Sequence, residues 1–323
     1  MKNFLYVLAI IVSLPLAGRY ALAQSYPNKP LRLSVGFPAG VGTDITARIL
    51  APYLAEGLGQ PVIVDNKPGL GGVLSASEVT KAAPDGYTLC FTTTSSIVTG
   101  PYLMDRPPYD PVRSFTPIGQ IAEVYFAGVV PHQHPANSLK EFAAWAKANA
   151  NAGKVNYASV GSGSVSHLVG AQLDQIAGLR MTHVPYKGSI VADLMSGRIQ
   201  ISFALTSTVA PLVQSGKLKA LAVTSSARYP DLPNVPTVRE AGYPALEFVL
   251  WQGLLAPAET PKEVIGRLSA ELKRIVVKAE LRERFAKVGN VIAYRGPEEF
   301  SALIKADVDR WLPVIKSSGA KFE

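Results

Sequence analysis

The chain has 323 residues, of which 48% are hydrophobic and 17% are charged, so it is long enough to bury the core of one large or two moderate domains. Its formal net charge is +8, but Lys and Arg are scattered among Asp and Glu, which argues against a basic nucleic-acid-binding stripe. The single cysteine excludes an internal disulfide and a cysteine zinc site, and the sequence predicts neither a metal nor a cofactor.

Residues 1–23 have the pattern of a secretory signal peptide. Lys2 supplies the positive start, residues 4–17 are almost wholly apolar, and small residues around Ala23 form a cleavage pattern. A membrane anchor is the alternative, but the apolar run is shorter than the ~20 residues that a span needs. We therefore expect export to the periplasm, cleavage after Ala23 and a mature chain that starts at Gln24.

After this leader, predicted strands and helices alternate, which is the signature of an α/β protein. The first unit is expected to have strands at 31–37, 62–65 and 87–92 and helices at 44–57 and 73–82. The second unit is expected to have strands at 155–159, 182–185, 199–205 and 218–224 and helices at 139–150, 165–178, 190–196 and near 208–215.

Two apolar, extended segments, 118–130 and 246–255, are candidate crossovers between two domains. Helices predicted at 261–279 and 297–318 are expected to return to the first domain. The predicted organisation is a signal peptide at 1–23, a first domain at 24–123 plus 250–323, and a second domain at 124–249.

A glycine-rich turn follows the first predicted strand and leads into a helix. A helix N-terminus carries unpaired N–H groups and partial positive charge, and glycines let a ligand approach the main chain. The turn therefore suits a carboxylate, although an ordinary turn with an Asp cap is equally compatible. Thr43 or Asp44 is expected to cap the helix. Two other roles stay open for Asp44: it could hold a bridging water or accept a hydrogen bond from a donor group on the ligand. The turn consists of Phe37, Pro38, Ala39, Gly40, Val41, Gly42, Thr43 and Asp44.

A second turn of this kind follows the strand at 155–159. It holds more serines than capping requires, so a binding role is favoured over a plain turn with a serine N-cap. His167, at the start of the next helix, is by itself more often structural than catalytic. The candidate residues are Gly161, Ser162, Gly163, Ser164 and His167.

Hydroxyl side chains follow two predicted strands, where ligands of open α/β sheets bind. They are Ser95 and Ser96 after 87–92, and Thr206 and Ser207 after 199–205, with a plain capping tract as the alternative. Cys90 and Trp251 are expected in the core. His132 and His134 are expected in an exposed loop, without metal-site spacing.

Several segments in order along nearly the whole mature chain resemble the Bug family of periplasmic solute receptors, the binding components of tripartite tricarboxylate transporters. The matching segments are 26–33, Phe37 to Gly40 with Asp44, 64–72, 82–89, Gly161 to Ser164 with His167, 184–189, 216–224, 233–237 and 253–257.

The resemblance implies a type II periplasmic-binding-protein-like α/β fold, with two mixed sheets and a cleft between two domains. It implies small carboxylate ligands, such as di- and tricarboxylates, amino acids or aromatic acids, and a membrane permease as partner. It also implies that the 37–44 turn holds a carboxylate, that the 161–164 turn forms the opposite wall, and that Ser95 and Ser96 add hydroxyl contacts. A monomer without catalytic residues is expected.

The chain departs from the family pattern at three places. Val41 stands where a second Gly is usual, the 189–193 region looks about two residues shorter, and Ala204 replaces a common Asp. An acid at that last position would favour a ligand with a donor or a cation. Its absence favours an unaminated, partly apolar carboxylate.

Two alternative functions stay open. The first is an orphan receptor that presents its carboxylate to a signalling partner, which genomic neighbours would reveal. The second is a secreted serine hydrolase that uses Ser162 or Ser164 with His167. It is disfavoured because the chain lacks a Gly-x-Ser-x-Gly elbow and no orienting acid is evident.

Overall fold

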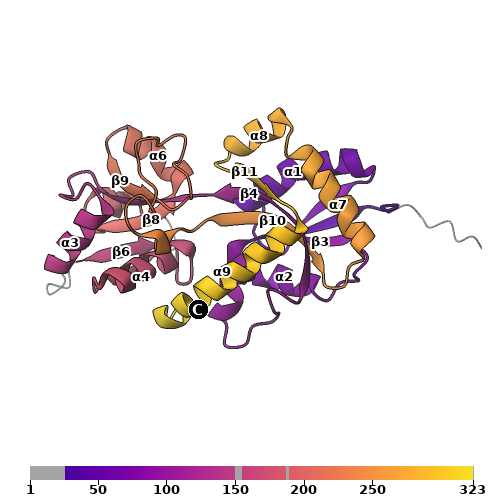
Figure 1. Ribbon diagram of the computed structural model, residues 1–323, viewed down its shortest axis with the longest axis horizontal. Helices are drawn as coiled ribbons and strands as arrows, with labels where there is room; N and C mark the ends of the chain where they lie inside the picture. Colours follow the sequence, from indigo (N-terminus) through magenta and orange to yellow (C-terminus); the bar gives the residue numbers. More distant parts are fainter. Residues whose placement is uncertain (1–25, 150–154, 187–188, 323) are drawn as a thin grey trace, which may run out of the picture.

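The computed structural model describes residues 26–149, 155–186 and 189–322; the predicted signal peptide and its cleavage site lie outside the described residues. Within these ranges, no helix is both long and apolar enough to cross a membrane. The predicted α/β class with two mixed sheets is confirmed: one sheet has six strands and the other five, and each has its own helices (Figure 1).

The six-stranded sheet is built from both ends of the chain. Its order is β11-β4-β10-β3-β1-β2, with β1 parallel to its neighbours and β10 antiparallel to both of its own. The strands are β1 (Leu31–Val35), β2 (Val62–Asn66), β3 (Thr88–Thr93), β4 (Phe115–Val124), β10 (Leu250–Pro257) and β11 (Val291–Arg295). The helices are α1 (Gly42–Leu58), α2 (Val73–Val79), α7 (Lys262–Ile275), α8 (Ala279–Ala286) and α9 (Pro297–Ser318).

Alternation along β3 explains why this sheet is covered on both faces. Leu89 and Phe91 join the core under α1, α7 and α8, whereas Cys90 between them joins the core under α2 and α9. Successive side chains of a strand point to opposite faces, so a continuous apolar run has side chains buried on both faces of the sheet. Cys90 is 2% exposed and burial raises the pKa of its thiol to about 12, which confirms its expected place in the core.

The five-stranded sheet has the order β7-β6-β8-β5-β9. The helices α3 and α4 cover one face, and α5 and α6 the other. Its strands are β5 (Phe126–Pro131), β6 (Asn156–Ser159), β7 (Thr182–Pro185), β8 (Ile201–Leu205) and β9 (Leu218–Val223). Its helices are α3 (Leu139–Asn149), α4 (Val165–Ala177), α5 (Val191–Met195) and α6 (Thr206–Gln214).

The chain passes between the sheets at two places. It leaves the first sheet at Tyr125, between β4 and β5, and returns at Val249, before β10. On the return, the Thr94 hydroxyl donates to the Val249 carbonyl at 3.2 Å and accepts from the Trp251 N–H at 3.0 Å. Helix α9 also runs from the first sheet toward α4, so one apolar core continues across both halves (Figure 1).

The apolar, extended segments 118–130 and 246–255 cross between the two sheets as expected, at Tyr125 and at Val249. Other expectations about the fold were wrong. The helix expected at 261–279 ends at Ile275, and α8 and β11 were not predicted. His134 is buried rather than in an exposed loop: its ring packs edge-on against Trp145, and burial lowers its pKa to about 4.

Candidate functional site

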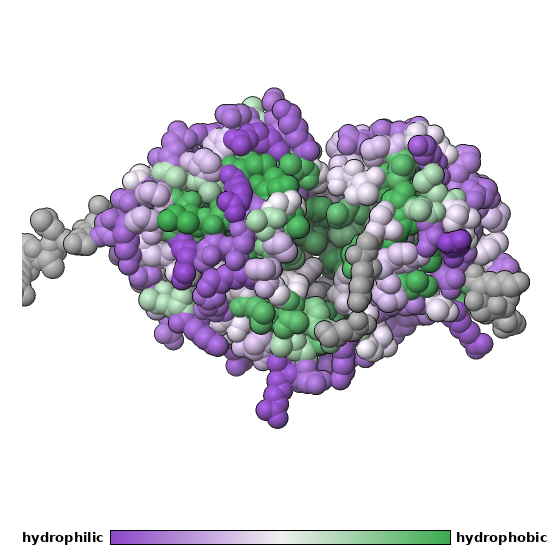
Figure 2. Space-filling view, turned by 180° about the vertical axis from the view of Figure 1, so that it is seen from behind, coloured by the Kyte–Doolittle hydropathy of each residue, from purple (hydrophilic) through white to green (hydrophobic). Residues whose placement is uncertain are grey.

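Two adjoining pockets lie between the sheets, at the ends of β3, β6 and β8. Their volumes are about 300 and 280 Å³, and both are lined by Ser95, Val160 and Ser164, so they form one cleft. Figure 2 shows the hollow between the two halves, with hydrophobic residues inside it. The larger pocket is lined by Ser95, Phe126, Val160, Ser164, Val165, Ser166, Ser189, Ile190, Val191, Phe203, Ala204, Leu205, Thr208 and Leu250. The smaller one is lined by Phe37, Gly71, Ser95, Thr99, Gly100, Leu103, Val160, Ser162, Gly163, Ser164 and Phe322.

The first turn is held by Asp44, although not in the way expected. Helix α1 begins at Gly42 with Val41 as its N-cap residue, and no side chain caps it, so the expected cap by Thr43 or Asp44 was wrong. Asp44 instead turns back, and its carboxylate accepts the N–H of Gly40 at 2.8 Å. Its side chain is 1% exposed, so it is enclosed by the turn.

Two more side chains, Arg48 and Asn66, join Asp44 in holding the turn, and we call this hydrogen-bonded set the clasp of the turn. Arg48 donates from Nε to the Asp44 carboxylate at 3.0 Å, and Asn66 donates to the same carboxylate at 2.7 Å. Asn66 also donates to the Phe37 carbonyl at 3.0 Å. Burial alone would raise the pKa of Asp44, but the hydrogen bonds from Arg48, Gly40 and Asn66 hold it below its usual value. Asp44 is therefore an anion fixed inside the turn.

The clasp leaves the start of α1 open toward solvent. Among the described residues, no partner is found for the N–H groups of Gly42, Thr43 and Asp44, as is usual for a first helical turn. A side chain at Gly40 or Gly42 would meet nothing within 4 Å, so the main chain there is accessible. Pro38, Ala39, Gly40, Val41 and Gly42 are exposed, and of this turn only Phe37 lines the cleft as it stands.

In the second turn, before α4, Ser164 and Ser166 form hydrogen bonds within the turn itself. Ser164 is the N-cap: its hydroxyl accepts from the His167 N–H at 3.4 Å and donates to the Gly161 carbonyl at 2.6 Å. The Ser166 hydroxyl accepts the Val160 N–H at 3.2 Å. The plain N-cap interpretation therefore accounts for Ser164, which also lines both pockets. Ser162 and Gly163 line the smaller pocket.

His167 repeats in the second turn what Asp44 does in the first. Its Nδ1 accepts the Gly163 N–H at 3.0 Å, so in both turns the side chain four residues after a glycine holds that glycine's N–H. The ring stacks on His183 with centroids 3.8 Å apart and planes 4° apart. Burial, with the nearby His183, lowers the pKa of His167 to about 4. His167 lines neither pocket, and its occupied Nδ1 leaves the hydrolase alternative without support.

The His167 clasp predicts an acid-sensitive cleft. Unfolded His167 binds a proton below pH ~6.5, whereas folded His167 does so only below about 4, so stability is lost as pH falls through this window. We expect a loss of about 3 kcal/mol from this group. His167→Asn keeps an acceptor for Gly163 but does not titrate, so it should flatten the dependence of unfolding free energy on pH. His134 and His183 also have lowered pKa values and supply the slope that remains. An unchanged slope in His167→Asn would contradict this role.

The hydroxyl residues predicted after the two strands fall into different places. Ser95, in a turn of π-helix at Ser95–Thr99, lines both pockets. Ser96 is 2% exposed and donates to the Gly71 carbonyl at 3.0 Å, so it supports the neighbouring turn instead. Thr206 is fully buried and bonds the Tyr125 carbonyl, and Ser207 lies against Gly289. The next residue, Thr208, is the one that lines the pocket.

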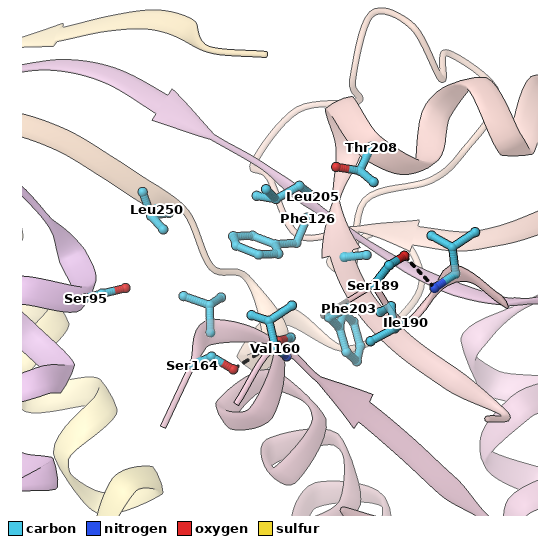
Figure 3. A pocket seen from close by; sticks show the side chains of 14 residues that line it. Ser95, Phe126, Val160, Ser164, Ser189, Ile190, Phe203, Leu205, Thr208 and Leu250 are labelled. Atoms are coloured by element: carbon cyan, nitrogen blue, oxygen red, sulfur yellow. Dashed lines mark hydrogen bonds between the residues drawn. The ribbon is translucent and has the colours of Figure 1, made fainter. Parts of the chain in front are cut away.

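An apolar wall, formed by Phe126, Val160, Phe203, Leu205 and Leu250, was missed from the sequence. In Figure 3, Phe126 and Val160 lie between Ser95 on one side of the cleft and Phe203 with Ile190 on the other. These residues sit in or beside predicted strands, where apolar side chains are usually assigned to the core. The unusual exposure of Val160, at 65%, is visible only in the folded chain.

Comparisons with known proteins agree with one another. The sequence profile of the Tripartite tricarboxylate transporter family receptor matches residues 46–320. The protein BugT of Bordetella pertussis is 32% identical over 326 residues, which cover 100% of this chain and 99% of BugT. The solved structure of MatC from Rhodopseudomonas palustris with bound malate is 31% identical with a TM-score of 0.72, and covers 90% of this chain and 100% of MatC. The solved structure of the R. palustris protein Rpa4515 with adipate is 30% identical with a TM-score of 0.75. The match covers 92% of this chain and 99% of Rpa4515.

Proposed function

The chain belongs to the tripartite tricarboxylate transporter receptor family, and from this premise we propose that it is a periplasmic receptor for a small organic carboxylate. Proteins of this family and the structural neighbours are solute-binding receptors rather than enzymes. The neighbours named above hold malate and adipate, both carboxylates, which supports the same ligand chemistry here.

The observation that carries the proposal is the pair of clasped turns on different sheets. Each turn ends at a helix N-terminus, where free N–H groups and the helix dipole favour an anion. Asp44 and His167 hold the turns from behind, so these two residues position the site rather than touch the ligand. We propose that the N–H groups of Gly42, Thr43 and Asp44 take the carboxylate when the cleft closes. Ser95, which follows β3 of the first sheet, then adds its hydroxyl from the same side, and the 161–164 turn meets the ligand from the other side.

Closure would occur about the two crossovers at Tyr125 and Val249, as hinge motions use a few residues between elements. We propose that the two bodies that move are the predicted domains, 24–123 plus 250–323 and 124–249. We further propose that the leader is cleaved after Ala23, that the mature protein is a monomer, and that its closed form docks on a membrane permease of the tripartite tricarboxylate type.

The test is thermal unfolding of the mature protein against mono-, di-, tri- and aromatic carboxylates, after carried-over ligand is removed by unfolding and refolding. At ~100 times its dissociation constant, a ligand adds roughly 2.7 kcal/mol to stability, which raises the melting temperature by several degrees. A rise with one class of acid supports the receptor. No rise with any acid, in a protein shown to be folded, would overturn it.

A backbone variant tests the main-chain site. Gly42→Pro deletes one unpaired N–H at the first position of α1, where proline is tolerated and the extended Val41 suits a following proline. We expect the affinity for the stabilising acid to fall at least about tenfold, the value of one hydrogen bond to a charged group. Lys262→Pro, at the first position of α7 after Pro261, is the matched control and should bind normally. Equal affinities in both variants would contradict the assigned N–H groups.

A further inference from the structure

We propose that the ring of Phe322 sets the length of the acid that the cleft accepts; the inference rests on the proposed function and names a residue that selects its ligand. Phe322 follows α9 and lines the smaller pocket. The other described residues that line this pocket lie between 37 and 103 in the first half and between 160 and 164 in the second, far from Phe322 in the chain. Folding therefore brings this ring to the cleft, and no local pattern of the sequence signals it.

The segment that carries Phe322 is fixed to the first half of the molecule. Gly319, in the left-handed conformation with φ +65°, ends α9. The Phe322 N–H then donates to the carbonyl of the buried Leu103 at 3.0 Å. On the surface, Lys321 pairs with Asp105 at 2.9 Å. The ring therefore extends from a backbone whose position is set by the first half.

The ring forms one wall of the smaller pocket together with two glycines. A Cβ atom placed on Gly71 would lie 3.5 Å from Cζ, at the tip of the Phe322 ring, and one placed on Gly100 would lie 3.7 Å from it. All three residues line the smaller pocket. The half-buried ring packs against the core and also borders the pocket, so it fills space that the two glycines leave open and that a ligand could otherwise use.

The two halves of the molecule already touch beside this wall. A Cβ atom placed on Gly163 would lie 2.3 Å from Leu103 Cδ1, so Leu103 of the first half packs directly on the second turn. Both residues line the smaller pocket. Each CH₂ group that a ligand buries in such a pocket favours binding roughly fourfold. That gain stops where the ligand meets the Phe322 ring, because a further group would have to displace packed atoms.

Series of acids of increasing length test this directly. Isothermal titration of monocarboxylates from acetate to decanoate, and of dicarboxylates from oxalate to sebacate, gives the length of the tightest acid for the stripped, mature protein. Benzoate and the larger 2-naphthoate serve the same purpose for aromatic acids. Phe322→Ala should move the optimum to longer acids. An acid longer by two CH₂ groups than the best acid of the unaltered protein should gain at least about tenfold relative to that acid.

A larger side chain should have the opposite effect. Phe322→Trp should move the optimum to shorter acids, and a mere loss of packing in this segment would not produce that shift. Lys321→Ala is the matched control, because it alters the same segment at an exposed side chain that is not among the described residues of either pocket. Since exposed ion pairs contribute little, it should keep both the melting temperature and the optimum.

The outcomes separate this inference from the proposed function. If acids bind, and both Phe322→Ala and Phe322→Trp keep the optimum of the unaltered protein, the ring does not limit the ligand and the inference is wrong, while the receptor function stands. If no acid of these series or of the wider panel binds the folded protein, the receptor function itself fails, and this inference with it.

Discussion

Replacing Asp44 by alanine is expected to lower the affinity for the carboxylate ligand at least about 100-fold and to destabilise the protein by about 3 kcal/mol. The variant removes the acceptor of the Gly40 N–H and the shared partner of Arg48 and Asn66. Hydrogen bonds to a charged group contribute about 1.5–3 kcal/mol each, but the exposed Arg48 regains water, which keeps the total at the low end. The turn then loses the geometry that aims its free N–H groups at a common point.

Urea unfolding and ligand titration measure the two effects. Asp309→Asn is the matched control, because Asp309 pairs with Lys305 on the exposed face of α9, where such pairs contribute little. Asp44→Asn should lie between alanine and the unaltered chain, since its amide oxygen still accepts from Gly40. A positioning role lowers the affinity for all acids alike. A change confined to acids that carry a donor would show instead that Asp44 reads the ligand directly.

The second large effect is expected at Trp251. Its side chain is 1% exposed, meets the Phe300 ring edge-on with centroids 4.9 Å apart, and donates from Nε1 to Asp307 at 2.8 Å. Trp251→Ala should cost about 4 kcal/mol, because it leaves a cavity between β10 and α9. It also leaves the partly buried Asp307 carboxyl, whose pKa is raised to about 6 by desolvation, without this donor.

Trp251→Phe separates the two contributions, since it keeps an aromatic ring but removes the Nε1 donor. We expect it to cost about 1–2 kcal/mol in urea unfolding. The buried position of Trp251 agrees with the core role expected from the sequence, so ligand affinity in a folded Trp251→Phe protein should be unchanged. If Trp251→Ala lowers the free energy of unfolding by less than about 1 kcal/mol, the packing of Trp251 against α9 does not stabilise the protein as proposed.

Local patterns explain why much of the fold could be predicted. The strand at 182–185 was predicted with its exact bounds, and the helix at 165–178 to within one residue, because periodicity and small-residue turns act over a few neighbours. A local bond of the same range starts α3, where the Ser138 hydroxyl accepts the Glu141 N–H at 3.1 Å. The missed β11 has its pairing partner, β4, far away in the chain.

The sequence by itself therefore determined the α/β class and the two small-residue turns that lead into α1 and α4. Only the tertiary structure decided which side chains line the cleft. Asp44 and His167 turn inward to hold their loops, Ser96 supports a neighbouring turn, and Val160 faces the cleft. The physical reason is that turn and helix hydrogen bonds join close neighbours, whereas the direction of a side chain depends on what the rest of the chain packs around it.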